Sequence, residues 1–315
     1  MIINQSNLHG LTTGFSTAFN KALSEVSPDY RDIATVTSSS TAANDYAWLG
    51  QIPGMKEWIG DREVQHISEY GYTIKNKSFE RTIGINRDAI EDDQYGIYTP
   101  MFSMMGQEAG EHYNDLVFEM LTKGFTEKCY DEKTFFAADH VSGEKTFSNT
   151  STAALSTESF LAARQAMMSI TGDKNKPLKL VPDLLVVSPK NEMVAKKILE
   201  ASLIDGTTNI TQNLAKIKVA TELSGDNEDA WFLLCTKKFL KPIILQIRKK
   251  IKFDMLTKDT DLNVFLQKEY LYGCDCRDNA GFGFWQMAYG STGKTSGLGL
   301  CTAPRPKSLE RSGMI

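Results

Sequence analysis

A long amphipathic stretch constrains the fold of this chain more than any other feature. From Pro100 to Lys123, apolar side chains recur every three or four residues, which is the spacing of one face of an α-helix. Thr99-Pro100 supplies a helix start and Gly124 a helix stop. Such a helix is roughly 36 Å long and exceeds the mean length of helices in globular proteins. We therefore expect it to brace the whole subunit. Its apolar stripe comprises Phe102, Met105, Ala109, Tyr113, Leu116 and Met120.

Two runs with a period of two precede this stretch. Apolar and polar residues alternate in 70–75 and again in 79–86, with a short polar turn at 76–78 between them. The pattern predicts a β-hairpin. A two-stranded hairpin is marginally stable alone in water, so it should lie on another surface, which could belong to another chain. The aromatic residues that would contact that chain are Trp58, Tyr70 and Tyr72.

The remaining segments mix helices with strands. An arm at 1–45 carries one amphipathic helix and a polar segment, 35–45, which is expected to be an extended linker. A helix capped by Ser156, a buried strand at 184–187 and a helix through Leu199 follow. Further strands are expected at 217–220, 231–235, 242–247, 264–272 and 281–288. The order predicts an α+β fold with a protruding hairpin.

The composition is that of a globular protein. Of the 315 residues, 41% are hydrophobic and 23% are charged. The formal net charge of −4 argues against a protein that grips nucleic acid by bulk charge. No apolar run is long enough for a membrane span, no signal peptide is evident, and the five cysteines are expected to be reduced thiols. These features favour a soluble cytoplasmic protein.

Residues 288–295, AYGSTGKT, match a relaxed phosphate-loop pattern in which Ala288 replaces the first glycine. Such a loop binds phosphate only where it leads into the N-terminus of a helix. Here two glycines and two prolines follow within about ten residues, which excludes a helix. We therefore expect a Gly-rich tail, with Lys294 in no nucleotide site.

Other reactive residues lack partners in the sequence. Cys274 and Cys276 could offer two thiolates to a metal, but a closed zinc site needs four ligands and no second Cys/His pair is present. No histidine lies in a known catalytic frame. The carboxylates along the long helix lack a Glu-x-x-His partner motif. No catalytic residue, cofactor or metal is expected. The histidines are His9, His66, His112 and His140.

Two charged runs are typical of solvated faces. One is acidic, at 91–93, and the other is basic, at 248–252. The alternatives are that the two runs meet across a subunit boundary, or that the basic run faces nucleic acid. The candidate intersubunit contacts in these runs are Glu91, Asp92, Asp93, Arg248, Lys249 and Lys250.

The sequence resembles the Mu-like (pro)phage major head subunit family, the gpT-like proteins. The most specific stretch is FERTIGINRDAIEDDQYGIYTPMFSMMGQEAGEHYNDLVFEML at 79–121. Two further stretches support the resemblance through their order along the chain: PDLLVVSPKNEMVAKKILEA at 182–201 and NAGFGFWQMAYGS at 279–291. The resemblance covers essentially residues 2–293.

This resemblance implies the Hong Kong 97-type capsid fold. The implied parts are an N-terminal arm at 1–45, an extended loop at 46–87, a peripheral domain at 88–150 with its spine helix at 100–123, an axial domain at 151–240, returning peripheral strands at 241–293 and a flexible tail at 294–315. The implied function is a major capsid protein that self-assembles into the icosahedral shell around double-stranded phage DNA. Another phage structural module, such as a tail or decoration protein, is the main alternative, and a nucleotide-binding enzyme is a less favoured one.

The implied partner is the chain itself, in pentamers and hexamers. Because the arm before the hairpin is short and carries no long charged coil, we expect the scaffold and the protease to be separate proteins. We expect the portal to be a separate protein as well. Packaged DNA would be contacted without sequence specificity, and no membrane partner is expected. The protein would act in the virion after assembly in the bacterial host cytoplasm.

Overall fold

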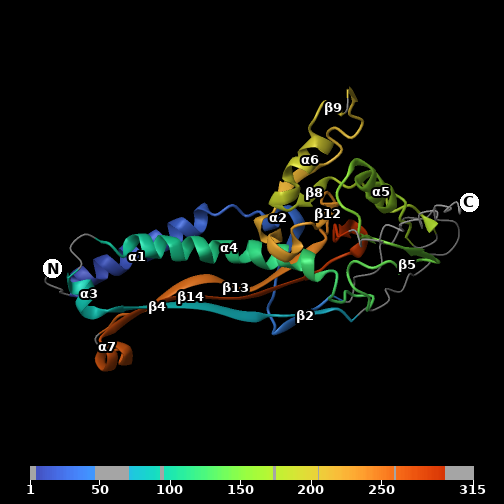
Figure 1. Ribbon diagram of the computed structural model, residues 1–315. Helices are drawn as coiled ribbons and strands as arrows, with labels where there is room; N and C mark the ends of the chain where they lie inside the picture. Colours follow the sequence, from blue (N-terminus) through green and yellow to red (C-terminus); the bar gives the residue numbers. More distant parts are fainter. Residues whose placement is uncertain are drawn as a thin grey trace, which may run out of the picture.

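The computed structural model describes residues 5–46, 71–92, 96–172, 175–204, 206–258 and 260–294. They form a long spine region of helices lying on a four-stranded sheet, joined to a lobe built on a five-stranded sheet (Figure 1). This mixture of helices and sheets confirms the predicted α+β class. Within the described ranges, no helix is long and apolar enough to cross a membrane.

The long helix predicted at 100–123 is present as α4 (Thr99–Lys123). A proline lies in its first turn, where the missing N–H removes no hydrogen bond. Of its predicted stripe, Phe102, Met105 and Met120 are buried, whereas Ala109, Tyr113 and Leu116 are half-buried. Gly124 ends the helix with φ −58°, so a left-handed conformation is not the reason for glycine. The reason is space, because a Cβ at Gly124 would lie 2.8 Å from the Phe136 ring.

A second helix, α1 (Gln5–Glu25), packs along α4 through two glycines of α4. A Cβ at Gly106 would lie 2.3 Å from the carbonyl oxygen of Phe19. A Cβ at Gly110 would lie 2.6 Å from Cγ2 of Val26. The absence of side chains at these two positions lets the helix axes approach closely.

Gly106→Ala should lower the free energy of unfolding by about 1–3 kcal/mol, because the added methyl meets backbone that cannot move aside. Gly14→Ala is the matched control, since a Cβ there meets nothing within 4 Å on an exposed face of α1. The control should gain about 0.5–1 kcal/mol from helix propensity. Urea unfolding of the unassembled subunit measures both changes. Equal stability of the Gly106→Ala subunit and the wild type would contradict this packing.

The four-stranded sheet of the spine region has the order β1-β13-β14-β4. β1 (Ala34–Ser38) is parallel to β13 (Ile243–Leu256), whereas β13, β14 (Glu269–Phe282) and β4 (Lys77–Asn86) are antiparallel neighbours. Along most of β14, alternate side chains are buried, and α4 contacts this strand (Figure 1). The side chains on the buried face include Tyr270, Tyr272, Cys274, Cys276 and Asp278.

The predicted hairpin is wrong, although both of its runs contain strands. β3 (Thr73–Lys75) pairs with β2 (Ala43–Asp45), while β4 pairs with β14. Asn76 lies between β3 and β4, and its side chain donates to Ser39 Oγ at 2.9 Å and to Thr41 O at 2.8 Å. Alternation identifies a strand but does not choose its partner, and both runs pair with distant strands. The expected linker at 35–45 is also wrong, since it supplies most of β1 and all of β2.

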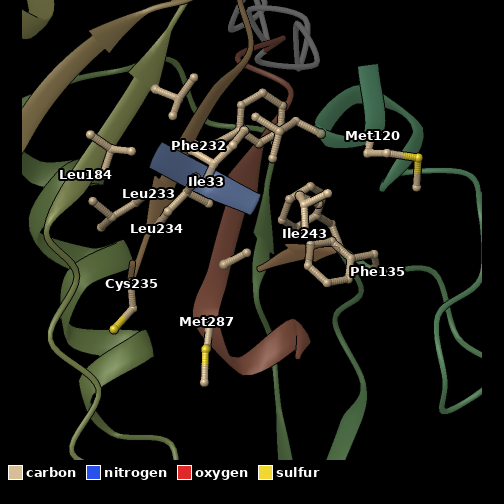
Figure 2. Packing of buried hydrophobic residues seen from close by; sticks show 14 of the residues in the cluster. Ile33, Met120, Phe135, Leu184, Phe232, Leu233, Leu234, Cys235, Ile243 and Met287 are labelled. Carbon is tan, nitrogen blue, oxygen red and sulfur yellow. The ribbon is translucent and has the colours of Figure 1, made fainter. Parts of the chain in front are cut away.

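The lobe contains the predicted buried strand as β8 (Leu184–Val187), next to β12 (Trp231–Leu234). Both strands are fully buried along their length. The lobe sheet has the order β11-β8-β12-β15-β7, in which β11 is Lys216–Val219, β15 is Ala288–Ser291 and β7 is Thr150–Ser151. Figure 2 shows Ile33 beside Phe232 and Ile243 beside Phe135. All four belong to one buried cluster, so a continuous core joins the lobe to the start of β13.

Three expectations about later strands need correction. The run predicted as a strand at 281–288 covers only the last two residues of β14, a 3-10 helix at Trp285–Met287 and the first residue of β15 (Ala288–Ser291). The strand predicted at 242–247 continues to residue 256 as β13. The run predicted as a strand at 264–272 begins inside a short helix, α7 (Leu262–Gln267), and β14 starts only at Glu269. The other elements in the described part of the chain are α2 (Tyr30–Ile33), α3 (Arg87–Asp92), α5 (Thr157–Met168), α6 (Glu192–Leu199), β5 (His140–Ser142), β6 (Lys145–Phe147), β9 (Leu203–Ile204), β10 (Thr207–Thr208) and 3-10 helices at Pro189–Asn191, Thr221–Leu223 and Gly225–Asn227.

Candidate functional site

The aromatic candidates for intersubunit contact have different outcomes. Trp58 and Tyr70 lie outside the described residues. Tyr72 packs against the core of its own chain, and its hydroxyl accepts a hydrogen bond of 2.8 Å from the backbone N–H of Phe282. Its ring is half-buried within its own subunit, and its contact with a neighbouring subunit stays a prediction.

The acidic run is only partly described. Glu91 and Asp92 end α3, and Asp92 is exposed. The side chain of Glu91 and the whole of Asp93 lie outside the described part. Among the residues that the structure does describe, no ion pair joins this run to the basic run within one subunit.

The basic run lies in the middle of β13, where two register irregularities interrupt the pairing with β14. Arg248, Lys249 and Lys250 are exposed there. The ammonium of Lys249 forms an ion pair with Asp275 on β14, so it is engaged within the subunit. In the described ranges, Arg248 and Lys250 have no such partner, which leaves two cations free for contacts outside the subunit.

An exposed apolar patch at the far end of the spine region escaped the sequence reasoning. α7 presents Leu262, Phe265 and Leu266 to solvent with relative exposures of 74%, 78% and 70%. Val264 points inward, and Asn263 Nδ2 donates to the backbone oxygens of Leu256 and Glu269 at 3.1 and 2.7 Å. The sequence signal was the spacing of 262, 265 and 266, which is helical. The strand predicted at 264–272 obscured it.

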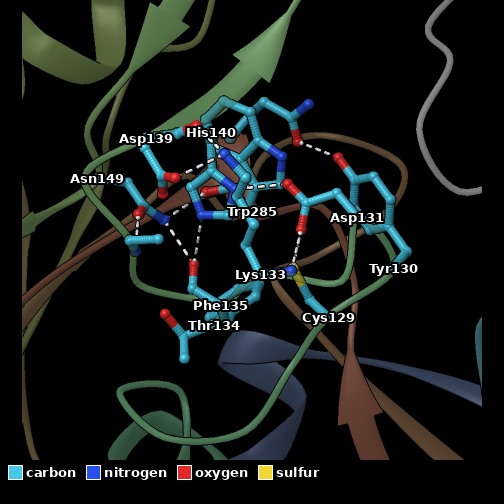
Figure 3. A network of polar contacts seen from close by, with 12 residues as sticks. Cys129, Tyr130, Asp131, Lys133, Thr134, Phe135, Asp139, His140, Asn149 and Trp285 are labelled. Atoms are coloured by element: carbon cyan, nitrogen blue, oxygen red, sulfur yellow. Dashed lines mark hydrogen bonds and ion pairs between the residues drawn. The ribbon is translucent and has the colours of Figure 1, made fainter.

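A buried polar network holds the loop after α4 (Figure 3). His140 Nδ1 lies 2.6 Å from Asp131 Oδ2, and its Nε2 lies 3.2 Å from Phe135 O. The Trp285 ring stacks on the imidazole at 4.1 Å between centroids. Cys129 Sγ donates to Asp131 Oδ1 at 3.1 Å. Burial opposes ionisation of Asp131, but hydrogen bonds from His140 and Cys129 outweigh it and hold its pKa below the ordinary value of 3.8.

Asp131→Asn should cost about 3 kcal/mol of unfolding free energy at neutral pH, because it breaks a buried charged contact. A carboxyl whose folded pKa is depressed stabilises the fold above its unfolded pKa, and this stability is lost as pH falls through the folded value. Wild-type stability should therefore drop below about pH 4, and the variant should lack that component. Urea unfolding at several pH values measures both effects. Exposed Asp139→Asn is the control and should leave stability nearly unchanged; the same pH dependence in Asp131→Asn and wild type would contradict the assignment.

A second cluster lies between α4 and β14. His112 Nε2 lies 3.0 Å from Asp278 Oδ1, and Cys276 is close to both residues. Asp278 is fully buried, and its Oδ2 has no hydrogen-bond partner among the described groups. The sequence argument against a metal considered Cys/His pairs and the carboxylates along the long helix. It did not foresee that a histidine of α4 would meet a cysteine and an aspartate of β14.

The carboxylates along α4 have ordinary partners. Glu108 pairs with Arg81 of β4 at 2.5 Å, and Glu119 pairs with Lys123 at 2.8 Å. Burial and then the neighbouring Glu111 raise the pKa of Asp115. These pairs fit the predicted solvated or partner-facing side of the helix.

The phosphate-loop alternative fails on backbone geometry. Residues 288–291 are β15, which pairs with β12 and β7 inside the lobe sheet. Gly290 N–H donates to Asn149 O and Thr292 N–H donates to Ser151 O, so these amides cannot cradle a phosphate. Lys294 follows as an exposed residue.

The solved structures that this chain resembles define its class. A chain in the procapsid of bacteriophage JBD30 is 34% identical, with a TM-score of 0.59, over 92% of this chain and 76% of that chain. The fold is that of a phage capsid protein.

Sequence relatives define the family. The Mu-like prophage FluMu major head subunit of Haemophilus influenzae is 34% identical over 93% of this chain and 75% of its own length. The major capsid protein of Escherichia phage Mu is 33% identical over 91% and 74%. The profile of the family "Mu-like prophage major head subunit gpT" matches residues 8–154, 146–223 and 216–302. The chain belongs to this family of major head subunits, a structural family without enzymatic activity, and the resemblance read from the sequence is confirmed.

Proposed function

We propose that this chain has the Hong Kong 97-type capsid fold and self-assembles, through pentamers and hexamers, into an icosahedral shell around double-stranded phage DNA. Family membership over more than nine-tenths of the chain carries the proposal. The long helix on a ribbon of strands, with an α/β lobe at one end, supports it (Figure 1). In this proposal, 46–87 contains the extended loop, and the lobe corresponds to the axial domain at 151–240 together with β15. Within 241–293, the strands β13 and β14 return to the peripheral domain.

The partners follow from the same proposal. Scaffold, protease and portal would be separate proteins, and assembly would take place in the bacterial host cytoplasm. DNA would be enclosed rather than read, which fits a formal net charge of −4. The contacts that build the shell would be made by copies of this chain.

The apolar patch on α7 is a candidate for such a contact. A surface helix normally turns its apolar face inward, whereas α7 exposes Leu262, Phe265 and Leu266 on one face. Contiguous exposed apolar side chains mark interaction sites. The occupant we propose is the same region of neighbouring copies, because the patch lies at the end of the spine region, away from the lobe (Figure 1).

The free cations of the basic run should make assembly dependent on salt. Exposed ion pairs contribute about 0–1 kcal/mol each and are screened by salt, but a shell repeats each contact many times. Replacing Arg248 and Lys250 together by Glu should lower assembly yield and change its salt dependence, with little change in subunit melting temperature. Light scattering across a salt series measures this effect. The control replaces exposed Lys237 and Lys238 by Glu, with the same change in net charge; equal effects would show that net charge alone matters.

Sedimentation velocity of the purified protein tests the proposed function. We expect rings and particles much larger than a dimer, with a distribution that shifts with protein concentration. A single monomer or dimer under all assembly conditions would contradict self-assembly.

A further inference from the structure

Three side chains with metal-binding atoms converge at a point that the proposed subunit contacts do not use. His112 projects from α4 towards Cys276 and Asp278, which lie two residues apart on the buried face of β14. The histidine nitrogen, the thiol sulfur and a carboxylate oxygen all lie within 4.8 Å of one another. Cys276 is 6% exposed, whereas the His112 side chain keeps 20%.

The carboxylate of Asp278 is incompletely satisfied. Its Oδ1 contacts His112 Nε2 at 3.0 Å, but its buried Oδ2 has no partner among the described residues. A buried charge is costly unless it is paired and fully hydrogen-bonded, or bound to a metal. A cation between the three side chains would supply the missing interaction.

The ligand types and spacing suit zinc. Cysteine sulfur, histidine nitrogen and aspartate oxygen are its usual protein ligands, and ligand atoms around a tetrahedral zinc lie about 3–4 Å apart. The three ligand atoms lie within 4.8 Å of one another, so small side-chain movements would bring them to that spacing. We propose that His112, Cys276 and Asp278 bind a divalent transition-metal ion of the zinc type, which joins α4 to β14.

A pocket gives access to this cluster. Its volume is about 210 Å³, and it is lined by His112 and Cys276 together with Cys274 and Glu108. Cys274 lies on the same face of β14, so its thiol or a water in the pocket can complete the coordination. A free cysteine thiol is mostly protonated at neutral pH. Binding would release that proton to solvent as the sulfur–metal bond forms.

The cluster of Cys129, Asp131 and His140 provides an internal contrast. It also offers three ligand types within 4.8 Å, but both oxygens of Asp131 accept hydrogen bonds and both His140 nitrogens face oxygens. The Asp131 and His140 ligand atoms of that cluster already have partners, so a metal there would have to displace existing hydrogen bonds. Its thiol is the matched control.

The first test uses the wild-type protein with zinc and cobalt salts. Protein dialysed against zinc should retain about one equivalent per subunit by elemental analysis. Cobalt should produce a thiolate-to-metal charge-transfer band and the intense visible bands of tetrahedral coordination, and zinc should abolish both. Retention far below one equivalent, or an octahedral cobalt spectrum without the charge-transfer band, would overturn the proposal.

Variants locate the site. His112→Gln, Cys276→Ser and Asp278→Asn should each weaken binding by at least about tenfold, and Cys276→Ser should lose the charge-transfer intensity. Cys129→Ser should bind as the wild type does. His112 is the most exposed of the three ligands, so its variant is the least disruptive to folding, and circular dichroism checks each fold. Loss of binding in Cys129→Ser, with retention in His112→Gln, would assign the metal to the other cluster and refute this one.

Discussion

Replacement of residues 48–69 by a short Gly-Ser linker should abolish particle formation and leave a folded subunit. The subunit should tolerate the change because the described residues on either side of this segment lie together: Tyr46 N–H donates to Tyr72 O at 2.8 Å. β3 and β4 are kept, and with them the pairing of β4 to β14 over its whole length. A wider deletion, of 62–84, would remove most of β4 and destabilise the subunit itself.

The reason for the expected loss is the proposed role of this segment between subunits. If Trp58 is an anchor in a neighbouring copy, Trp58→Ala alone should reduce particle yield by about tenfold or more. Sedimentation and thermal melting of both variants measure assembly and folding separately. Shells of normal size from the linker variant would contradict an intersubunit role for the segment.

A charge placed on the α7 patch should impair particle formation nearly as much as the replacement of residues 48–69. Phe265→Asp puts an unpaired carboxylate into a contact that we propose is apolar, and a truncated hot spot alone costs about 2 kcal/mol or more per contact. The subunit should melt at the wild-type temperature, because the Phe265 side chain is 78% exposed. Particle yield, measured by sedimentation, should fall by more than about tenfold.

Phe239→Asp is the matched control for this variant. Phe239 is 98% exposed in the loop between β12 and β13, so the substitution changes the same side chain on another surface. It should leave assembly intact. If Phe239→Asp and Phe265→Asp suppress assembly equally, an added charge anywhere is sufficient, and the special role of α7 is wrong.

The sequence predicts well those elements that local patterns specify. The apolar period of α4, the all-apolar run of β8 and the serine cap of α5 each depend on neighbours within a few residues, and all three are present as expected. The Ser156 cap forms a reciprocal pair of hydrogen bonds with Ser159. The family resemblance also identified the class of protein, because it compares residues in their order along the chain and needs no knowledge of distant contacts.

Partner choice between distant strands could not be predicted in this way. The strand β3 ends at Lys75 and β4 starts at Lys77, one residue apart, yet β3 pairs with β2 and β4 with β14. The side chain of Asn76, which bonds back towards Ser39 and Thr41, anchors the chain where these pairings diverge. Nothing in the alternation of either run encodes these partners.

The candidate metal ligands show the same limit. His112 and Asp278 are 166 residues apart and meet only because α4 lies on the buried face of β14. Cys276 drew attention in the sequence through its neighbour Cys274, but the nitrogen and oxygen that would complete a site came from elsewhere. The apolar face of α7 was missed for a different reason. Its residues also suit a strand, and a strand was predicted there.

A cryo-electron microscopy reconstruction of particles assembled from the purified protein tests the central claim most directly. The proposed function predicts closed icosahedral shells in which the lobes surround each capsomer centre and α7 contacts neighbouring copies. It also predicts that residues 47–70 reach an adjacent subunit. Particles whose subunits meet through the lobe alone, with α7 and residues 47–70 exposed to solvent, would contradict the account.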